Sequence, residues 1–365
     1  MPTAQTQHGA ETLALMRLQL TPGLGRKTLL QLLKHFHSGL AILELPRTVW
    51  PQAGIASRCW GPTPPADDPQ VQRQLQQLEQ LGGCLISSQS DDYPALLATI
   101  PDAPPLLYLY GTIPDQPALA IVGSRQASRD GLLFARQLSA DLARAGFCIV
   151  SGAARGIDCA AHEGALKAGG SSLAILGNGL DIPYPPTSRH LYQTIPQRGA
   201  LISEYPPGTV PHPSHFPARN RIISGLCQGI VVIEAGQRSG SLITAEFALE
   251  QGRDVFAVPG SCYTPNSQGS LQLLKDGATL ITCAEDILEA YHLSARPTAK
   301  PPQPLATELT ETQQQILQLL ENQAKHVDEL AGESGLTPME VSAIVLHLEL
   351  QGLVTAQPGA YYTAR

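Results

Sequence analysis

Two arginines and an asparagine stand close together in the segment Phe216–Leu226, whose residues are Phe-Pro-Ala-Arg-Asn-Arg-Ile-Ile-Ser-Gly-Leu. The pattern predicts a loop that runs into the first turn of a helix. Such a turn leaves backbone N–H groups unpaired and carries partial positive charge, so it attracts anions before any side chain contributes. Because Arg219 and Arg221 would add full charges beside Asn220, the segment predicts a phosphate-binding site.

Arginines stand at three comparable junctions elsewhere in the chain. Arg125 follows an apolar run, Arg155 lies in a second small-residue turn, and Arg238 precedes a turn with two serines. If these junctions line one edge, they form a groove that tracks phosphates, although each turn is also consistent with a structural role. The binding candidates are Gly123, Ser124, Arg125, Ser151, Gly152, Arg155, Gly156, Phe216, Arg219, Asn220, Arg221, Arg238, Ser239, Gly240 and Ser241.

The junctions follow apolar, β-branched runs that alternate with helical patterns between residues 118 and 291. The predicted strands are Ala118–Val122, Cys148–Val150, Ser172–Leu176, Ala200–Ser203, Gly229–Glu234, Asp254–Val258 and Ala278–Ile281. Near-continuous apolarity with a helix-length segment between strands is typical of a parallel sheet covered on both faces. We therefore predict an α/β fold, an extended Rossmann-like, doubly wound, mostly parallel sheet. Ligands of such sheets bind beyond the carboxyl ends of the strands, where the arginine junctions fall.

Smaller domains are expected on both sides of this core. The predicted organisation is a helical N-terminal domain over 1–82, the core over 83–292, a Pro-rich linker over 293–305 and a winged-helix domain over 306–365. The N-terminal segment fits a helix-hairpin-helix or a related bundle, with a turn at Leu20–Gly25. That turn either presents amides to DNA phosphates or only joins packed helices.

Charge is unevenly distributed along the chain. The net charge is −7, and residues 303–365 carry 8 acidic groups against 2 basic ones. The third helix predicted for the winged-helix domain contains Glu340, His347 and Glu349 but neither lysine nor arginine. Since duplex binding by a winged helix requires basic phosphate contacts, this domain is expected to contact protein or support a dimer.

The composition is that of an ordinary globular protein, with 43% hydrophobic residues. No apolar run approaches the length that crosses a bilayer, and the N-terminus lacks the pattern of a signal peptide, so we expect a cytoplasmic protein with no membrane contact. The seven cysteines form no Cys-x-x-Cys pair and are expected to be reduced, buried thiols.

Common catalytic and cofactor motifs are missing from the sequence. Gly123-Ser124-Arg125 lacks the full Gly-x-Gly-x-x-Gly pattern, and neither a Walker-type Gly-Lys-Ser/Thr nor a Gly-x-Ser-x-Gly elbow occurs. His212 and His215 lack further ligands at metal-binding spacing. We therefore expect no cofactor, no metal and no catalytic residue. Four aromatic residues lie in loops predicted at the same edge and could instead stack on unpaired bases, namely Phe216, Tyr184, Tyr205 and Tyr263. An aromatic residue in a loop also often packs locally, so stacking is expected mainly at Phe216, beside the arginines.

Several of these motifs together resemble the DNA-processing protein A family, DprA or Smf. The resemblance is carried by Val122-Gly123-Ser124-Arg125, Ser151-Gly152 with Arg155-Gly156-Ile157-Asp158, Leu176-Gly177-Asn178-Gly179-Leu180-Asp181, Tyr184-Pro185, Ile202-Ser203-Glu204, Phe216–Leu226, Val232-Ile233-Glu234-Ala235, Ser239–Ala245 and Val258-Pro259-Gly260. It implies a homodimer that binds and protects single-stranded DNA and loads the RecA recombinase onto it during natural transformation and recombination. The family's binding roles would fall on Arg125, Phe216, Arg219, Asn220 and Arg221.

Two other classes of function stay open at this point. A related group of lysine-decarboxylase-like enzymes cleaves nucleoside monophosphates, and Glu204 and Glu234 could serve as its acid and base. That group's Pro-Gly-Gly-x-Gly-Thr run is absent, because the position reads Glu234-Ala235-Gly236-Gln237-Arg238. Alternatively, the chain is an adaptor whose arginines serve a protein interface.

Overall fold

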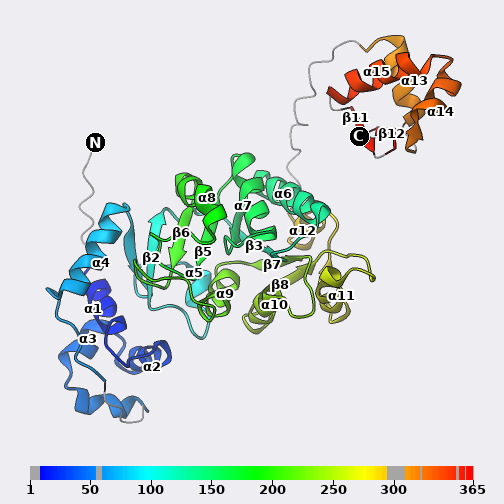
Figure 1. Cartoon of the computed structure of the whole chain (residues 1–365). Helices are drawn as coiled ribbons and strands as arrows, with labels where there is room; N and C mark the ends of the chain where they lie inside the picture. Colours follow the sequence, from blue (N-terminus) through cyan, green and yellow to red (C-terminus); the bar gives the residue numbers. More distant parts are fainter. Residues whose placement is uncertain are drawn as a thin grey trace. The chain divides into compact units, whose positions relative to one another are not determined.

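The computed structural model of the chain describes residues 9–54, 60–293, 309–320, 323–350, 353–357 and 359–364. The chain divides into two compact units, Met1–Arg296 and Pro297–Arg365, each with its own hydrophobic core (Figure 1). Apart from Leu293, the linker expected over 293–305 lies outside the described residues.

A nine-stranded sheet forms the centre of the first unit. Its order is β1-β2-β6-β5-β4-β3-β7-β8-β9, and the seven strands from β6 to β9 in this order are parallel, which confirms the predicted doubly wound, mostly parallel sheet. The parallel strands are β3 (Ala118–Gly123), β4 (Cys148–Ser151), β5 (Ser172–Leu176), β6 (Ala200–Ser203), β7 (Gly229–Ile233), β8 (Asp254–Ala257) and β9 (Thr279–Leu280). β7 ends one residue earlier than predicted because Glu234 has a φ of 49°, which no strand residue adopts.

Two antiparallel strands extend one edge of this sheet and were not predicted. β1 (Cys84–Ser87) pairs with β2 (Leu106–Gly111), and β2 pairs with β6. The antiparallel orientation needs no long crossover helix, and only the four-residue α5 (Ala95–Ala98) lies between β1 and β2, so the strand–helix alternation that marks the parallel part is weak here. The apolar run in β2 after Pro104 and Pro105 was the available signal.

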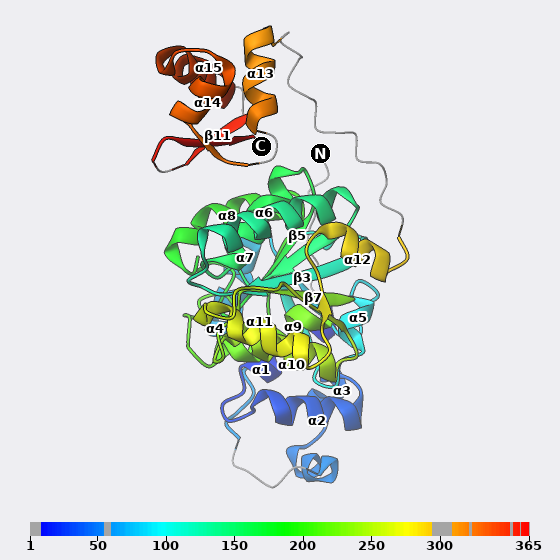
Figure 2. The same ribbon diagram turned by 90° about the vertical axis from the view of Figure 1, so that its right-hand side faces the viewer.

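Helices cover both faces of the sheet. Leu119 and Ile121 of β3 pack in one apolar cluster with α6, α7 and α12, whereas Ala120 and Val122 pack in another with α9 and α10, as expected when successive side chains alternate. Figure 2 shows these two sets on opposite sides of the strands. The helices of this part are α5 (Ala95–Ala98), α6 (Arg129–Arg144), α7 (Ile157–Lys167), η2 (Pro186–Ser188), α8 (Arg189–Thr194), η3 (Ile195–Gln197), α9 (His215–Gly225), α10 (Gly240–Glu250), η4 (Pro265–Ser267), α11 (Gln268–Lys275) and α12 (Ala284–Ala290).

Short helices precede the sheet in the same compact unit. They are α1 (Ala10–Gln19), α2 (Arg26–Phe36), α3 (Gly39–Glu44), η1 (Arg47–Ala53) and α4 (Pro69–Gln80). The predicted turn does lie between α1 and α2, and these helices enclose a small core around the buried Trp50. Leu15 and Met16 of α1 also pack against Tyr108 of β2, so the helices share part of their core with the sheet. Whether the backbone amides of this turn contact DNA phosphates stays an open prediction.

The second unit contains three helices and a three-stranded sheet. The helices α13 (Glu311–Leu320), α14 (Val327–Ser334) and α15 (Pro338–Leu350) surround an apolar cluster that includes Ile316, Leu330 and Val345. The predicted two-stranded wing is present as β11 (Val354–Gln357) and β12 (Tyr361–Ala364), and the short β10 (Lys325–His326) adds a third strand. The winged-helix fold is confirmed.

The six cysteines in the described part of the chain are free, but the prediction that they are buried was only partly correct. Cys148 and Cys227 are buried, whereas Cys262 is exposed, and Cys59 lies outside the described residues. Among the described residues, no helix is both long and apolar enough to cross a membrane.

Candidate functional site

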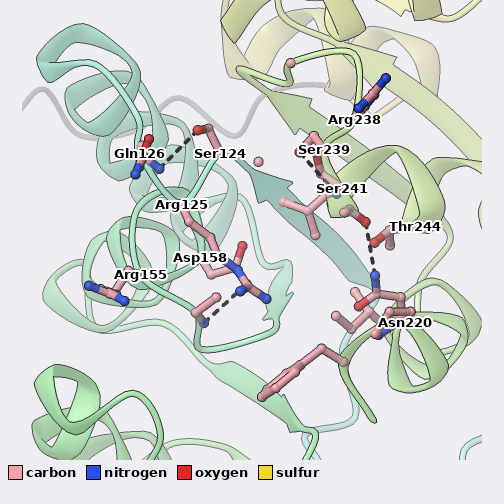
Figure 3. A pocket seen from close by; sticks show the side chains of 18 of the residues that line it. Ser124, Arg125, Gln126, Arg155, Asp158, Asn220, Arg238, Ser239, Ser241 and Thr244 are labelled. Carbon is pink, nitrogen blue, oxygen red and sulfur yellow. Dashed lines mark hydrogen bonds between the residues drawn. The ribbon is translucent and has the colours of Figure 1, made fainter. Parts of the chain in front are cut away.

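A cavity of about 830 Å³ opens at the carboxyl edge of the parallel strands. The loops that follow β3 and β7 both line it, and these neighbouring strands lead to opposite halves of the sheet. Ligands of doubly wound folds bind at this kind of switch point. Eleven of the predicted residues line the cavity, namely Gly123, Ser124, Arg125, Arg155, Phe216, Arg219, Asn220, Arg238, Ser239, Gly240 and Ser241. Several of them are shown in Figure 3.

Three exposed arginines, here called the rim arginines, surround this cavity. Arg125 follows β3, Arg155 precedes α7, and Arg238 lies between β7 and α10. Figure 3 shows that the three side chains come from separate loops, with Arg125 between the other two. Because they are exposed, the rim arginines can pair with phosphates without first losing a buried partner.

An aromatic pair lies beside Arg125. The guanidinium carbon of Arg125 is 5.5 Å from the ring centroid of Phe216, within the range of a cation–π contact. The Phe216 and Tyr184 ring centroids are 5.4 Å apart, and the planes are tilted by 31°. Both rings line the cavity, so a flat ligand group could contact an aromatic face while an anion meets Arg125.

The start of α10 contributes donors from another side of the cavity. Ser239 is the N-cap residue, and its hydroxyl accepts a hydrogen bond from the backbone N–H of Ser241. Asn220 donates from its side-chain amide to the carbonyl of Gly240 over 3.1 Å, which ties α9 to this turn. Since a helix start carries partial positive charge, it adds to the attraction for anions.

Arg219 lines the cavity but is itself buried, with 3% exposure. It donates to the carbonyl of Gly152 over 2.9 Å and to the side-chain oxygen of Asn220 over 3.2 Å. Burial lowers the pKa of Arg219 to about 10, and the nearby Asp158 opposes that shift, so the side chain is protonated at neutral pH. Burial also raises the pKa of Asp158, against the attraction of Arg219. Arg219 therefore supplies a fixed positive charge below the cavity surface.

Three of the predicted residues support the cavity without lining it. The hydroxyl of Ser151 donates to the carbonyl of Ile121 over 2.6 Å. A Cβ atom at Gly152 would collide with the Arg219 guanidinium, and Gly156 has a φ of 81° where a Cβ would meet the carbonyl of Ser124. These positions need their small side chains for close packing.

Arg221 does not line the cavity, although it lies in the same motif as Arg219. It is 1% exposed and forms ion pairs with Glu204 over 2.7 Å and with Asp102 over 2.8 Å. Glu204 also pairs with Arg26 of α2 over 3.5 Å. The structure thus uses Arg221 in a buried ion-pair network that connects α9 with the N-terminal helices.

The two carboxylates considered for an enzyme are not brought together. Glu234 accepts from the backbone N–H of Ser128 over 2.8 Å and from the Ser128 hydroxyl, so it holds the start of α6. Glu204 is paired with Arg221, and neither carboxylate lines the cavity. Of the other aromatic residues singled out, Tyr205 stacks on His215 with 4.1 Å between ring centroids, and Tyr263 is 93% exposed outside the cavity.

The doubly wound sheet and its arginine-lined cavity define an α/β protein with a site suited to phosphate-bearing ligands. The chain belongs to the family of DNA recombination-mediator protein A, whose model matches residues 84–292, and the DprA winged helix domain matches residues 300–360.

Individual relatives agree with this assignment. Protein Smf of Escherichia coli K12 is 41% identical over 303 residues, which cover 81% of each chain. The X-ray structure of DprA from Streptococcus pneumoniae has a TM-score of 0.67 and 37% identity, and covers 76% of this chain and 97% of its own. DprA from Helicobacter pylori, whose structure was reported for its single-stranded DNA binding mode, has a TM-score of 0.52 and 28% identity, covering 57% of this chain and 98% of its own.

Proposed function

We propose that the cavity binds single-stranded DNA. The main support is that three exposed arginines from three different loops line the same cavity as the aromatic pair of Phe216 and Tyr184, with Arg125 directly against Phe216. Proteins that bind single strands combine a cationic groove for the phosphates with aromatic faces on which bases stack. The single-stranded DNA binding mode described for the similar Helicobacter pylori protein supports the same ligand class.

Base stacking gives the proposed site a preference for single strands. A paired base inside a duplex presents only its edge, whereas an unpaired base can lay its face against Phe216. The rim arginines contact the backbone and give affinity that does not depend on sequence. The expected ligand is an unpaired strand of any sequence, bound with an affinity that falls as salt increases.

We further propose that the protein acts without catalysis, as a homodimer that protects incoming single strands and loads the RecA recombinase onto them during natural transformation and recombination. The family's description as a recombination mediator supports this role. The acidic second unit, with 8 acidic and 2 basic residues over 303–365, is proposed to contact protein rather than DNA.

Fluorescence anisotropy with a labelled oligo-dT strand and a duplex of equal length tests the ligand class. We expect tighter binding to the single strand at every salt concentration and a linear fall of log affinity with log salt. Equal binding to the duplex would contradict the stacking site. Incubation with nucleoside monophosphates tests the enzyme alternative, because release of free base would show catalysis.

A further inference from the structure

Three side chains outside the cavity converge near the start of α7. Cys159 and Glu163 stand one helical turn apart on α7, and His190 is the second residue of α8. The Cys159 sulfur, a Glu163 carboxylate oxygen and a His190 ring nitrogen all lie within 4.8 Å of one another. Figure 1 draws α7 and α8 side by side, and the two helices are in contact.

We propose that Cys159, Glu163 and His190 bind a zinc ion. This site is separate from the DNA cavity and does not depend on the function proposed above. Thiolate, imidazole and carboxylate together are ligands that zinc accepts, whereas magnesium and calcium prefer oxygen ligands alone. Three protein ligands leave a fourth position for water.

The distances between the ligand atoms fit a tetrahedral ion. The Cys159 sulfur is 3.4 Å from Oε1 of Glu163, and Nε2 of His190 is 3.4 Å from the same oxygen. With zinc bonds of about 2.3 Å to sulfur and about 2.0 Å to nitrogen and oxygen, the edges of a tetrahedron are about 3.5 Å and 3.3 Å. Two of the three edges therefore fit directly, and the third, between the Cys159 sulfur and the His190 ring nitrogen, is within 4.8 Å, so a small rotation of the exposed His190 side chain is expected to complete the site.

The surrounding structure positions Cys159 and Glu163 before an ion arrives. Cys159 packs against the apolar cluster that also holds Leu191 and Tyr192 of α8, so one core positions both helices. Arg136 donates to Oε2 of Glu163 over 3.1 Å, which leaves Oε1 directed toward Cys159 and His190. Such an outer partner typically orients a metal-binding carboxylate.

Charge and access also suit a divalent cation. A thiolate and a carboxylate supply two negative charges beside the ion, and Arg136 shares the carboxylate through its other oxygen. The Glu163 and His190 side chains are 35% and 51% exposed, so an ion and a water ligand can enter from solvent. In this structure, the Cys159 thiol donates a hydrogen bond to Oε1 of Glu163.

The test uses the full chain, freed of metal by a chelator. Zinc is titrated in competition with a chromophoric chelator, and cobalt is used as a spectroscopic substitute. We expect each chain to bind one zinc ion whose binding depends on Cys159, Glu163 and His190. The cobalt complex should show a thiolate charge-transfer band and the intense visible bands of a tetrahedral ion. Magnesium should not compete.

Three variants and one matched control decide the outcome. Cys159→Ser, Glu163→Gln and His190→Gln should each weaken zinc binding by at least about 100-fold, more than the loss of an outer partner. The control, Cys262→Ser with His35→Gln, removes an exposed thiol and an exposed imidazole elsewhere and should bind zinc as the wild type does.

Equal zinc binding by all variants, or cobalt binding without a thiolate band, would overturn the proposal. Since Glu163 and His190 are partly exposed, their variants are expected to fold, and circular dichroism of the metal-free proteins checks this. The zinc titration contains no DNA, so its result is independent of any failure of the single-strand assay.

Discussion

The rim arginines and the buried arginines of α9 use the same side chain for different purposes. Arg125, Arg155 and Arg238 are exposed around the cavity, whereas Arg219 and Arg221 are buried and bonded to neighbours within the protein. An exposed guanidinium can exchange water for a phosphate, but a buried one is already committed to its partners. The two arginines of helix α9 therefore chiefly hold the site together, and the proposed DNA contacts come mostly from the loops that carry the rim arginines.

The largest expected effect comes from removing a buried arginine. Arg221→Ala leaves Glu204, which is 7% exposed, without its close partner, and breaking a buried ion pair costs about 3–5 kcal/mol. Both tryptophans, Trp50 and Trp60, belong to the first unit, so their fluorescence in a urea titration reports its free energy of unfolding. The control variant Arg238→Ala, at the rim of the cavity, should change that free energy of unfolding by no more than about 0.5 kcal/mol. A loss below about 1 kcal/mol in Arg221→Ala would contradict the structural role.

The next effect concerns the aromatic pair of Phe216 and Tyr184 beside Arg125. Phe216→Leu keeps an apolar side chain but removes the face on which a base can stack, which is worth about 1–3 kcal/mol, or about 5- to 150-fold in affinity. The dependence of affinity on salt should stay the same, because no phosphate contact is lost. Anisotropy with oligo-dT measures both quantities. Tyr263→Leu, at an exposed ring outside the cavity, is the matched control and should bind like the wild type.

A smaller effect is expected in the pH dependence of stability, through the buried His162 near Arg219. Burial, together with the charge of Arg219, lowers the pKa of His162 from 6.5 to about 3. The unfolded chain therefore takes up a proton below pH 6.5 that the folded chain does not, so stability is lost as pH falls from 6.5 toward 3. This group should contribute a loss of about 1.4 kcal/mol between about pH 7.5 and pH 5.5.

The variant His162→Gln should lack that part of the pH dependence. Urea titrations give the free energy of unfolding of both proteins at the two pH values. The change between the two pH values is then compared between the variant and the wild type, which removes any constant difference in their stability. His35→Gln, at an exposed histidine, is the control. An unchanged pH dependence in His162→Gln would show that the buried histidine takes up its proton as readily as an exposed one.

Much of the fold and part of the site could be predicted from the sequence. The parallel strands were recognisable because strands buried on both faces are continuous apolar runs, and their carboxyl ends located the rim arginines. The sequence also allowed the prediction that Arg221 points away from Arg219, because residues two apart on a helix are rotated by about 200° and so face opposite sides. Its partners were not, because Asp102 and Glu204 come from distant loops. The proximity of Cys159 to His190 could not be predicted either, because the two residues lie on different helices, α7 and α8.

The proposal that the rim arginines bind the strand is tested by comparing two triple variants that lose the same charge. One replaces the rim arginines, as Arg125→Ala, Arg155→Ala and Arg238→Ala, and the other replaces exposed cations outside the cavity, as Arg73→Ala, Arg144→Ala and Lys167→Ala. Anisotropy with oligo-dT across a salt series is measured for both and for the wild type. The rim variant should lose affinity, and the magnitude of its slope of log affinity against log salt should fall by about 2, from three contacts of about 0.7 each, while the control keeps the wild-type slope. Equal losses in both variants would mean that net charge, and not this cavity, attracts the strand, and would contradict the proposed site.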